Sequence, residues 1–505
     1  MNLRTYAHHH LARFGSSTRA LAAGAGAGLA LGLVMPRGPM TSGQSLTALT
    51  LALGAGVLAG WISRSRWSAL FAPLALAAAF ELARLGTQGP SVGPIHLNDV
   101  YGIVVFIAGR GFDALVILLP MVVGALWGAS LARGGTPKAD GAPTRSRTRS
   151  VVGLVLRRGT LGLATLAVAV LVAGLARPAG TDAITGADGK PLPGSIAELV
   201  SVPIGGHDQS IMLRGNNVEA PVMLFLEGGP GGTAVGSMRY SGQGLEEHFV
   251  VATWDQRGTG KSASALEPVA TLTVAQAVSD TIEVSEYLRT RFGQSRVYLV
   301  GSSWGTILGV LTAQQRPDLF HAYVGTGQMV DPAETDKLMY AESLAYAARV
   351  GDSGFAERLQ AIGSPPYTDM LNYPIALSAN PDWDNYTPAA DHDNRSNYPA
   401  SLLVPEYTLT EQVRSMAAMM DTFALMYPQL QEVDFRRDVT RLDVPVYLVE
   451  AAHEAPGRAV LARQWYSALS APSKHVIGFE HSGHNPNLDE PARFAALMAD
   501  VVLRP

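Results

Sequence analysis

The chain has 505 residues, a mean hydropathy of +0.14, 16% charged residues and a formal net charge of −4. This length exceeds what one hydrophobic core normally serves, and so small a net charge gives no sign of a nucleic-acid partner. The sequence contains no cysteine, which excludes disulfides, thiolate metal ligands and a cysteine nucleophile. Because composition changes near residue 178, we predict a helical region over 1–178 and an α/β domain over 179–505.

Apolar stretches close to bilayer-spanning length recur along the first region. A transmembrane helix needs roughly 17–25 residues. The stretches are Ala20–Met35, Leu46–Ile62, Trp67–Leu82, Phe112–Leu131 and Thr160–Ala176. Because a cleaved signal peptide would account for only one of them, we predict an all-α transmembrane region of about five helices. The alternative is a soluble bundle of buried helices, but the stretches lack the amphipathic stripe that such helices carry.

Arginine and lysine are distributed unevenly among the segments that connect these stretches. If the N-terminus is inside, the inside segments hold twelve positive residues, including those of the run TRSRTRS (144–150). The outside segments near the membrane then hold four, which are Arg37, Arg84, Arg110 and Arg177. Positive residues favour the cytoplasmic side. The sequence therefore predicts a multi-pass protein of the cell membrane, whose C-terminal domain follows five spans and lies outside the cytoplasm.

The C-terminal domain alternates short apolar runs with helical stretches. The runs are Val222–Leu226, Phe249–Trp254, Val297–Val300, Ala322–Gly325, Val446–Val449 and His475–Phe479. This alternation predicts a mostly parallel sheet covered by helices on both faces. Ligands of such sheets bind at the carboxyl ends of the strands.

A glycine-rich run, LFLEGGPGG (224–232), follows the first of these strands, with Glu227 at the junction. Glycine supplies no side chain to a core and weakens a strand, so its density here predicts a close approach to the bare backbone.

The stretch YLVGSSWGT (298–306) contains Gly301, Ser303 and Gly305 in a G-x-S-x-G pattern, between a predicted strand and a predicted helix. This context is typical of a nucleophile elbow, which lifts a serine hydroxyl above the sheet. A serine nucleophile needs backbone N–H donors that meet the oxyanion formed on attack. We predict that the backbone N–H of Trp304, directly after the serine, is one donor and that a backbone N–H of the glycine-rich run is the other.

A serine also needs a base and an acid that orients the base. The segment FEHSGHNPNLDEP (479–491) offers His481 and His484 in a loop after the last strand. The acid should follow the strand VPVYLV (444–449), which favours Glu454. Glu450 is close to that strand and stays an alternative, whereas Asp443 lies at its wrong end.

Four ordered motifs together resemble the prolyl iminopeptidase branch of the α/β-hydrolase fold, over residues of about 195–505. They are GGPGG (228–232), WDQRGTGKS (254–262), GSSWGT (301–306) and FEHSGH (479–484). The resemblance implies Ser303 as nucleophile, His484 as base, and Gly229 and Trp304 as oxyanion donors. Members of that branch usually have histidine where Glu227 stands and G-x-x-D where Ala451–Glu454 stands, so this chain would use a glutamate as its acid.

Residues 331–437 interrupt the alternation of strands and helices, and the resemblance implies a helical cap there. Its many tyrosines and methionines suit an adaptable apolar pocket, although each of them could simply pack cap helices together. Glu227 has two interpretations. It braces the glycine loop, or it receives the ammonium group of a peptide, with Glu342 in the cap as a second substrate contact.

These observations predict a membrane-anchored serine hydrolase that acts through an acyl-enzyme, without metal or organic cofactor. By resemblance, the first expectation is an aminopeptidase that removes a small N-terminal residue such as proline from a small peptide. An esterase or lipid hydrolase at the bilayer surface is the alternative. A third hypothesis is a membrane module whose hydrolase domain only binds, but the motifs described above are intact.

Overall fold

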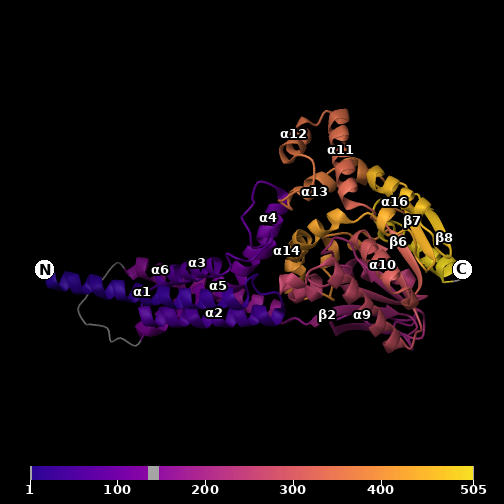
Figure 1. Cartoon of the computed structure of the whole chain (residues 1–505). Helices are drawn as coiled ribbons and strands as arrows, with labels where there is room; N and C mark the ends of the chain where they lie inside the picture. Colours follow the sequence, from indigo (N-terminus) through magenta and orange to yellow (C-terminus); the bar gives the residue numbers. More distant parts are fainter. Residues whose placement is uncertain (1–2, 135–146, 504–505) are drawn as a thin grey trace. The chain divides into compact units, whose positions relative to one another are not determined.

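The computed structural model describes residues 3–134 and 147–503, so residues 144–146 of the predicted basic run lie outside the described chain. The chain forms two compact units (Figure 1). The helical unit comprises Met1–Asn98, Ile103–Pro178 and Thr408–Arg414. The second unit comprises Asp99–Gly102, Ala179–Tyr407 and Ser415–Pro505. One short piece of the C-terminal half therefore belongs to the helical unit.

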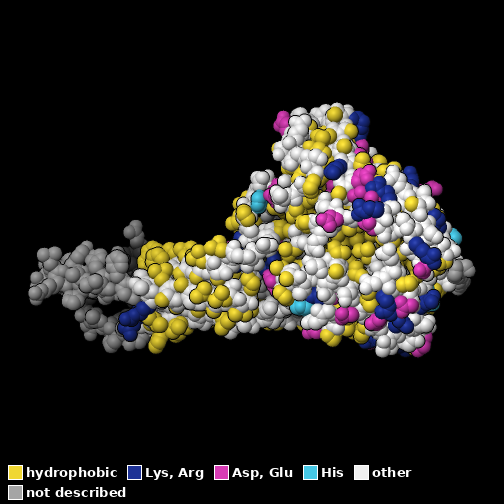
Figure 2. Space-filling model, in the orientation of Figure 1, with side chains coloured by type: hydrophobic (Ala, Val, Ile, Leu, Met, Phe, Trp, Pro, Cys, Tyr) yellow, Lys and Arg dark blue, Asp and Glu magenta, His cyan; other side chains and the backbone are white. Residues whose placement is uncertain are grey.

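The helical unit is built mostly from long apolar helices. Its elements are α1 (Leu3–Val34), α2 (Ser42–Ser63), α3 (Ser68–Ala83), the short α4 (Val100–Phe106), a π-helical turn (Ile107–Gly111), α5 (Phe112–Gly134) and α6 (Arg147–Ala176), and the start of α4 falls within the second unit. Four helical segments are long and apolar enough to cross a membrane: Ser17–Val34, Ser42–Ser63, Val100–Arg133 and Arg158–Ala176. The third predicted stretch forms α3, whose 16 residues make it shorter than those four. Hydrophobic side chains cover the visible face of this unit (Figure 2).

Glycines let these helices approach closely. A Cβ atom on Gly56 of α2 would lie 2.2 Å from the carbonyl oxygen of Met121, and one on Gly60 would lie 2.0 Å from that of Ala125. A step of four residues forward along α2, from Gly56 to Gly60, moves the contact four residues forward along α5, from Met121 to Ala125. The two helices therefore run parallel. The pair α1 and α3 shows the same arrangement, with Gly24 against Ala72 and Gly28 against Leu76. Small residues at this spacing are typical of helix contacts inside membranes.

A buried polar cluster marks one end of the helical unit. Asp113, at the start of α5, forms ion pairs with Arg414 and Arg84, and all three side chains are almost fully buried. Glu81 forms ion pairs with both Arg84 and Arg110. Buried charges persist only when they are paired. The cluster therefore holds the piece Thr408–Arg414 at the end where α3 ends and α5 begins.

The second unit contains one eight-stranded sheet in the order β1-β2-β4-β3-β5-β6-β7-β8. Its strands are β1 (Ile196–Ile204), β2 (His207–Gly215), β3 (Val222–Leu226), β4 (Val250–Asp255), β5 (Val297–Ser302), β6 (Phe320–Thr326), β7 (Val446–Ala451) and β8 (Lys474–Phe479). β2 pairs antiparallel with both β1 and β4, and all other pairs are parallel. The carboxyl ends of the six parallel strands therefore meet at one edge, as the alternation of strands and helices predicted.

Helices cover both faces of this sheet, and each face has its own core. In β3, Leu224 packs into one core and its neighbour Phe225 into the other, because successive strand side chains point to opposite faces. The first core includes side chains of α9 (Val274–Phe292), α10 (Trp304–Gln315) and α16 (Pro456–Ala468). The second includes side chains of α7 (Val235–Ser241), α8 (Gln243–Glu246) and α18 (Pro491–Ala496).

A mostly helical insertion separates β6 from β7, as expected for a cap. Its helices are α11 (Pro332–Val350), α12 (Ser353–Ile362), α13 (Asn372–Leu377), α14 (Leu409–Met426) and α15 (Phe435–Asp438). The first turns of α14 fall within the helical unit described above.

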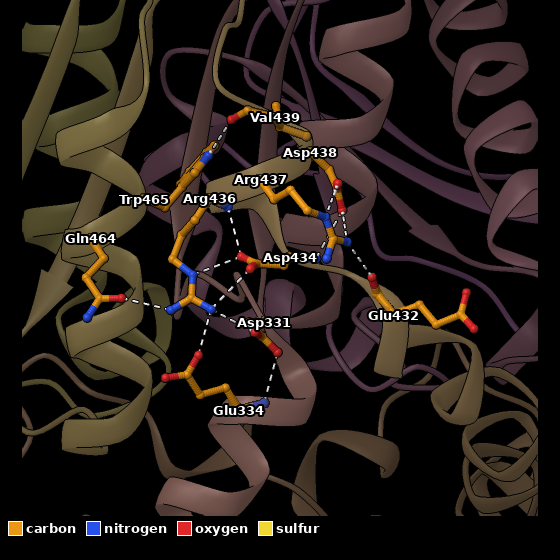
Figure 3. Close-up of polar contacts among 10 residues, drawn as sticks. All are labelled: Asp331, Glu334, Glu432, Asp434, Arg436, Arg437, Asp438, Val439, Gln464 and Trp465. Atoms are coloured by element: carbon orange, nitrogen blue, oxygen red, sulfur yellow. Dashed lines mark hydrogen bonds and ion pairs between the residues drawn. The ribbon is translucent and has the colours of Figure 1, made fainter.

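Arg436 joins the two ends of this insertion (Figure 3). Its guanidinium group, on α15, binds Asp331 and Glu334 at the start of α11 at 2.8 and 2.6 Å. It also donates to Gln464 of α16 at 2.9 Å. The insertion therefore leaves and re-enters the unit at one anchored point, which fixes the base of the cap beside α16.

Candidate active site

Ser303 lies at a strained turn between β5 and α10. Its backbone angles are φ +52° and ψ −118°, a conformation that residues with a side chain rarely adopt. The flanking glycines explain how the turn is tolerated. A Cβ atom on Gly301 would lie 2.4 Å from the carbonyl oxygen of Gly305, and one on Gly305 would lie 2.1 Å from that of Leu226. The G-x-S-x-G pattern thus forms the sharp strand-to-helix turn that the sequence predicted.

The glycine-rich loop after β3 runs directly beside this serine. A Cβ atom on Gly228 would lie 2.9 Å from that of Ser303. Gln256 connects the two loops, since it accepts a hydrogen bond from the Trp304 indole at 2.9 Å and donates to the Glu227 carbonyl at 3.0 Å. The close approach of bare backbone, which the glycine density predicted, is therefore an approach to Ser303.

His484 and Glu454 form a hydrogen-bonded pair. Nδ1 of His484 lies 2.7 Å from Oε2 of Glu454, a carboxylate whose side chain is only 7% exposed. Glu454 follows β7 and precedes α16, and His484 follows β8. Gly327, after β6, packs against the imidazole, because a Cβ atom there would lie 2.6 Å from Cε1 of His484. Three strand ends thus hold this pair in place.

Arg458, which the sequence reasoning missed, lies beside this pair. Its NH1 atom is 2.6 Å from Oε1 of Glu454 and 2.8 Å from Nδ1 of His484. Desolvation alone would raise the pKa of Glu454, but the charges of Arg458 and His484 and the hydrogen bonds outweigh it and lower this pKa to about 2. Glu454 is therefore ionised at neutral pH. The sequence does contain one indication of this role. Arg458 follows Glu454 by four residues, and α16 begins between the two residues.

Ser303, His484 and Glu454 open into one cavity of about 430 Å³. Gly229 and Arg458 line it too, and its exposed carboxylate is that of Asp384 from the cap. The apolar lining comes mostly from cap side chains: Met339, Tyr373, Leu377, Met419, Met420, Phe423 and Tyr427. Ser303 Oγ lies 3.8 Å from the sulfur of Met329, to which it donates a weak hydrogen bond.

The other predicted candidates lie elsewhere. His481 is exposed, and its backbone N–H donates to Glu490. Glu450 forms an ion pair with Arg463, and Asp443 is exposed and bound by Arg441. Neither Glu450 nor Asp443 contacts His484 in the described part of the chain.

Glu227 and Glu342 each accept a hydrogen bond from a backbone N–H group. The carboxylate of Glu227 accepts from Gly228 N–H at 2.9 Å, and that of Glu342 accepts from Gly457 N–H at 2.6 Å. Burial raises the pKa of both groups. Arg257, in the WDQRGTGKS motif, forms an ion pair with Asp280. Neither glutamate is among the described residues that line the cavity, and their role as substrate contacts stays a prediction.

The described residues include the groups that acyl transfer needs. Trp304 is the first residue of α10, so its backbone N–H has no acceptor within the helix. No group of three or more histidine, aspartate or glutamate side chains with the spacing of metal ligands occurs in the residues that were described.

Comparison with known proteins identifies the family. The family of the alpha/beta hydrolase fold matches residues 221–491, more than half of the chain. The chain belongs to this family. It is therefore a hydrolase, and its eight-stranded, mostly parallel sheet with a helical insertion is an α/β-hydrolase fold, as the motifs predicted.

Two relatives of this chain are named as peptidases. The "Probable aminopeptidase YbaC" of Bacillus subtilis (strain 168) is 32% identical over 309 residues, which cover 60% of this hydrolase and 95% of that protein. The "Probable proline iminopeptidase" of Leptolyngbya boryana is 35% identical over 110 residues, 21% of this chain and 30% of its own. Among solved structures, the proline iminopeptidase-related protein of Thermus thermophilus aligns with a TM-score of 0.42 and 21% identity, over 61% of this chain and 98% of its own.

Proposed function

We propose that this protein is a membrane-anchored serine aminopeptidase that acts through Ser303, His484 and Glu454. The observation that carries the proposal is the cavity that contains the elbow serine together with the hydrogen-bonded His484–Glu454 pair. The 32% identity to a protein named as an aminopeptidase, over nearly that protein's whole length, supports the choice of substrate.

The reaction proceeds in two halves. His484 takes the proton of Ser303 through Nε2 while Oγ attacks the substrate carbonyl, and Glu454 stabilises the imidazolium that results. The backbone N–H groups of Trp304 and Gly229 receive the oxyanion. His484 then protonates the leaving amine, which departs as the shortened peptide and leaves an acyl-enzyme. Water, activated by His484, attacks this ester, and the released amino acid restores Ser303.

Asp384 is the group that we assign to the free ammonium group of the substrate. An aminopeptidase must recognise a positive charge close to the scissile bond. Apart from the paired Glu454, Asp384 is the carboxylate among the described lining residues of the cavity, and its side chain is exposed. It lies in the short helix Pro381–Asp384 of the cap.

We expect Asp384→Asn to raise KM for aminoacyl-arylamides about 10- to 100-fold, because a hydrogen bond to a charged group contributes about 1.5–3 kcal/mol. Turnover of p-nitrophenyl esters should change little, since they carry no ammonium group. Asp382→Asn is the matched control, because Asp382 is in the same short helix but pairs with Arg349 and does not line the cavity. Equal losses on both substrate classes, or equal effects of the two variants, would contradict the assignment.

An esterase or lipid hydrolase is the second candidate, favoured by the methionines and aromatic rings that line the cavity. The same two substrate series separate the candidates. An aminopeptidase hydrolyses aminoacyl-arylamides with a higher kcat/KM than their N-acetylated forms. An esterase cleaves long-chain esters and leaves both arylamides intact.

The direction of the helices supports an extracytoplasmic catalytic unit. If α3 did not cross the membrane, α2 and α5 would be consecutive spans and would run antiparallel. Their glycine contacts show that they run parallel, so we infer that α3 crosses between them. Five crossings from an inside N-terminus place the end of α6 outside. Thr410, which forms a hydrogen bond with Ser45 at the start of α2, belongs to the same outer end.

Fusions with a reporter enzyme that works only outside the cytoplasm test this topology. A fusion after residue 190 should be active, and one near residue 140 should be inactive. A reporter that works only in the cytoplasm provides the control and should give the opposite pattern. Activity of the first reporter at residue 140, and not at 190, would place the catalytic unit in the cytoplasm.

A further inference from the structure

We infer that Arg458 is a positioning residue of the active site: it clamps one oxygen of Glu454 so that the other is held against His484. This inference rests on the proposed triad, because it assigns the role of a residue that acts through Glu454.

The two oxygens of Glu454 have separate partners. Oε1 accepts hydrogen bonds from the backbone N–H of Ala455 at 2.9 Å and from NH1 of Arg458 at 2.6 Å. Oε2 lies 2.7 Å from Nδ1 of His484. Two donors on one oxygen prevent rotation of the carboxylate and leave the other oxygen directed at the imidazole.

A glutamate needs such a clamp. Its side chain has three rotatable bonds, and holding it in a single geometry costs conformational entropy. The position of Arg458 supplies the constraint, since it lies four residues after Glu454 in the first turn of α16, where residues at this spacing face each other. Arg458 is itself held, with NH2 3.5 Å from the sulfur of Met339 and a side chain that is 13% exposed.

Arg458 also bears on the tautomer of His484. Its NH1 atom is 2.8 Å from Nδ1, so it could donate to Nδ1 if that nitrogen carried no proton. His484 would then be protonated on Nε2 and could not accept the proton of Ser303. That state, however, leaves Oε2 of a buried, ionised carboxylate without the donor that Nδ1–H supplies, which is costly. By keeping Glu454 ionised, Arg458 thus favours the tautomer in which Nε2 is free.

The test compares Arg458→Met with Arg463→Met. Both arginines are on α16, and each forms an ion pair with a glutamate near the end of β7. Arg458 binds Glu454, whereas Arg463 binds Glu450, which has no described contact with His484. The full-length protein in detergent is assayed for kcat and KM, and for the rate at which a fluorophosphonate labels Ser303. Ser303→Ala gives the background of labelling.

We expect Arg458→Met to lower kcat and the labelling rate about 10- to 100-fold, the loss typical of a misplaced catalytic group. KM should stay within about twofold, because the clamp acts on His484 and not on the bound substrate. Arg463→Met should behave like the wild type. Arg458→Lys, which keeps the charge with a single donor group, should give an intermediate kcat and serves as the test if the methionine variant does not fold.

A double-mutant cycle separates positioning from a merely structural role. In a Glu454→Gln background, Arg458→Met should change the labelling rate by less than about twofold, since the charge that it orients is gone. The same loss in both backgrounds would overturn the inference, as would wild-type kcat in Arg458→Met or Arg458→Lys. If Ser303→Ala were still labelled, the proposed triad itself would fail. If Ser303→Ala were unlabelled and Arg458→Met normal, only the role of Arg458 would fall.

Discussion

Ser303→Ala is expected to abolish turnover of arylamides and esters alike, with a loss of about 10⁴-fold or more in kcat. The hydroxyl is the attacking group in the proposed mechanism, and Ser303 is the lining serine that lies at the turn between β5 and α10. Alanine keeps the Cβ atom of serine, so the strained turn at φ +52° is no more strained than before. The variant should therefore fold, and its melting temperature should match that of the wild type.

The two histidines of the FEHSGH segment provide the matched control. His484→Ala should be as inactive as Ser303→Ala, because residues that act as one unit are not additive. His481→Ala should keep most activity, since its side chain is exposed and only its backbone contacts Glu490. A wild-type rate in Ser303→Ala, or a larger loss from His481 than from His484, would refute the mechanism.

The sequence reasoning reached the fold because its signals are local. The G-x-S-x-G turn needs glycines at 301 and 305 wherever a strand leads sharply into a helix, and the structure shows which backbone atoms exclude a side chain there. Strand and helix alternation likewise predicted the parallel sheet and the shared edge at which the carboxyl ends of its strands meet. The position of an acid after β7 followed from the same rule, although it left Glu450 and Glu454 as alternatives.

What the sequence did not predict depends on contacts between distant segments. Arg458 resembles any helical arginine until β8 brings His484 to it. Asp384 lies in a cap segment without periodicity, so nothing local indicates that it lines the cavity. The pairing of Arg414 with Asp113 is the strongest case, because it joins residues separated by 301 positions in the chain. Asp113 lies at the start of an apolar stretch and Arg414 lies in the cap segment of the sequence, so only the structure identifies them as partners.

Glu454→Gln is expected to lower kcat about 10³- to 10⁴-fold with little change in KM. A glutamine still fits, but it is neutral and cannot stabilise the imidazolium, and its amide can present the wrong hydrogen-bonding group to Nδ1. The effect on stability should depend on pH. The pKa of Glu454 in the folded protein is about 2, below its usual 4.5, so ionisation stabilises the fold above pH of about 4.5. This contribution is lost as the pH falls through 2.

The melting temperatures of wild type and Glu454→Gln should therefore converge as the solution is acidified from neutrality. Two carboxylates serve as controls for the rate. Glu450→Gln breaks an ion pair with the exposed Arg463, and Asp443→Asn removes a partner of Arg441, so both should keep nearly full activity. If Glu450→Gln lost more activity than Glu454→Gln, the acid would have to be reassigned to Glu450. The side chain of Glu450 would then have to leave Arg463 and reach the imidazole, displacing Glu454 from Nδ1. Such a rearrangement would also separate Arg458 from Glu454, so the role inferred for Arg458 depends on Glu454 being the acid.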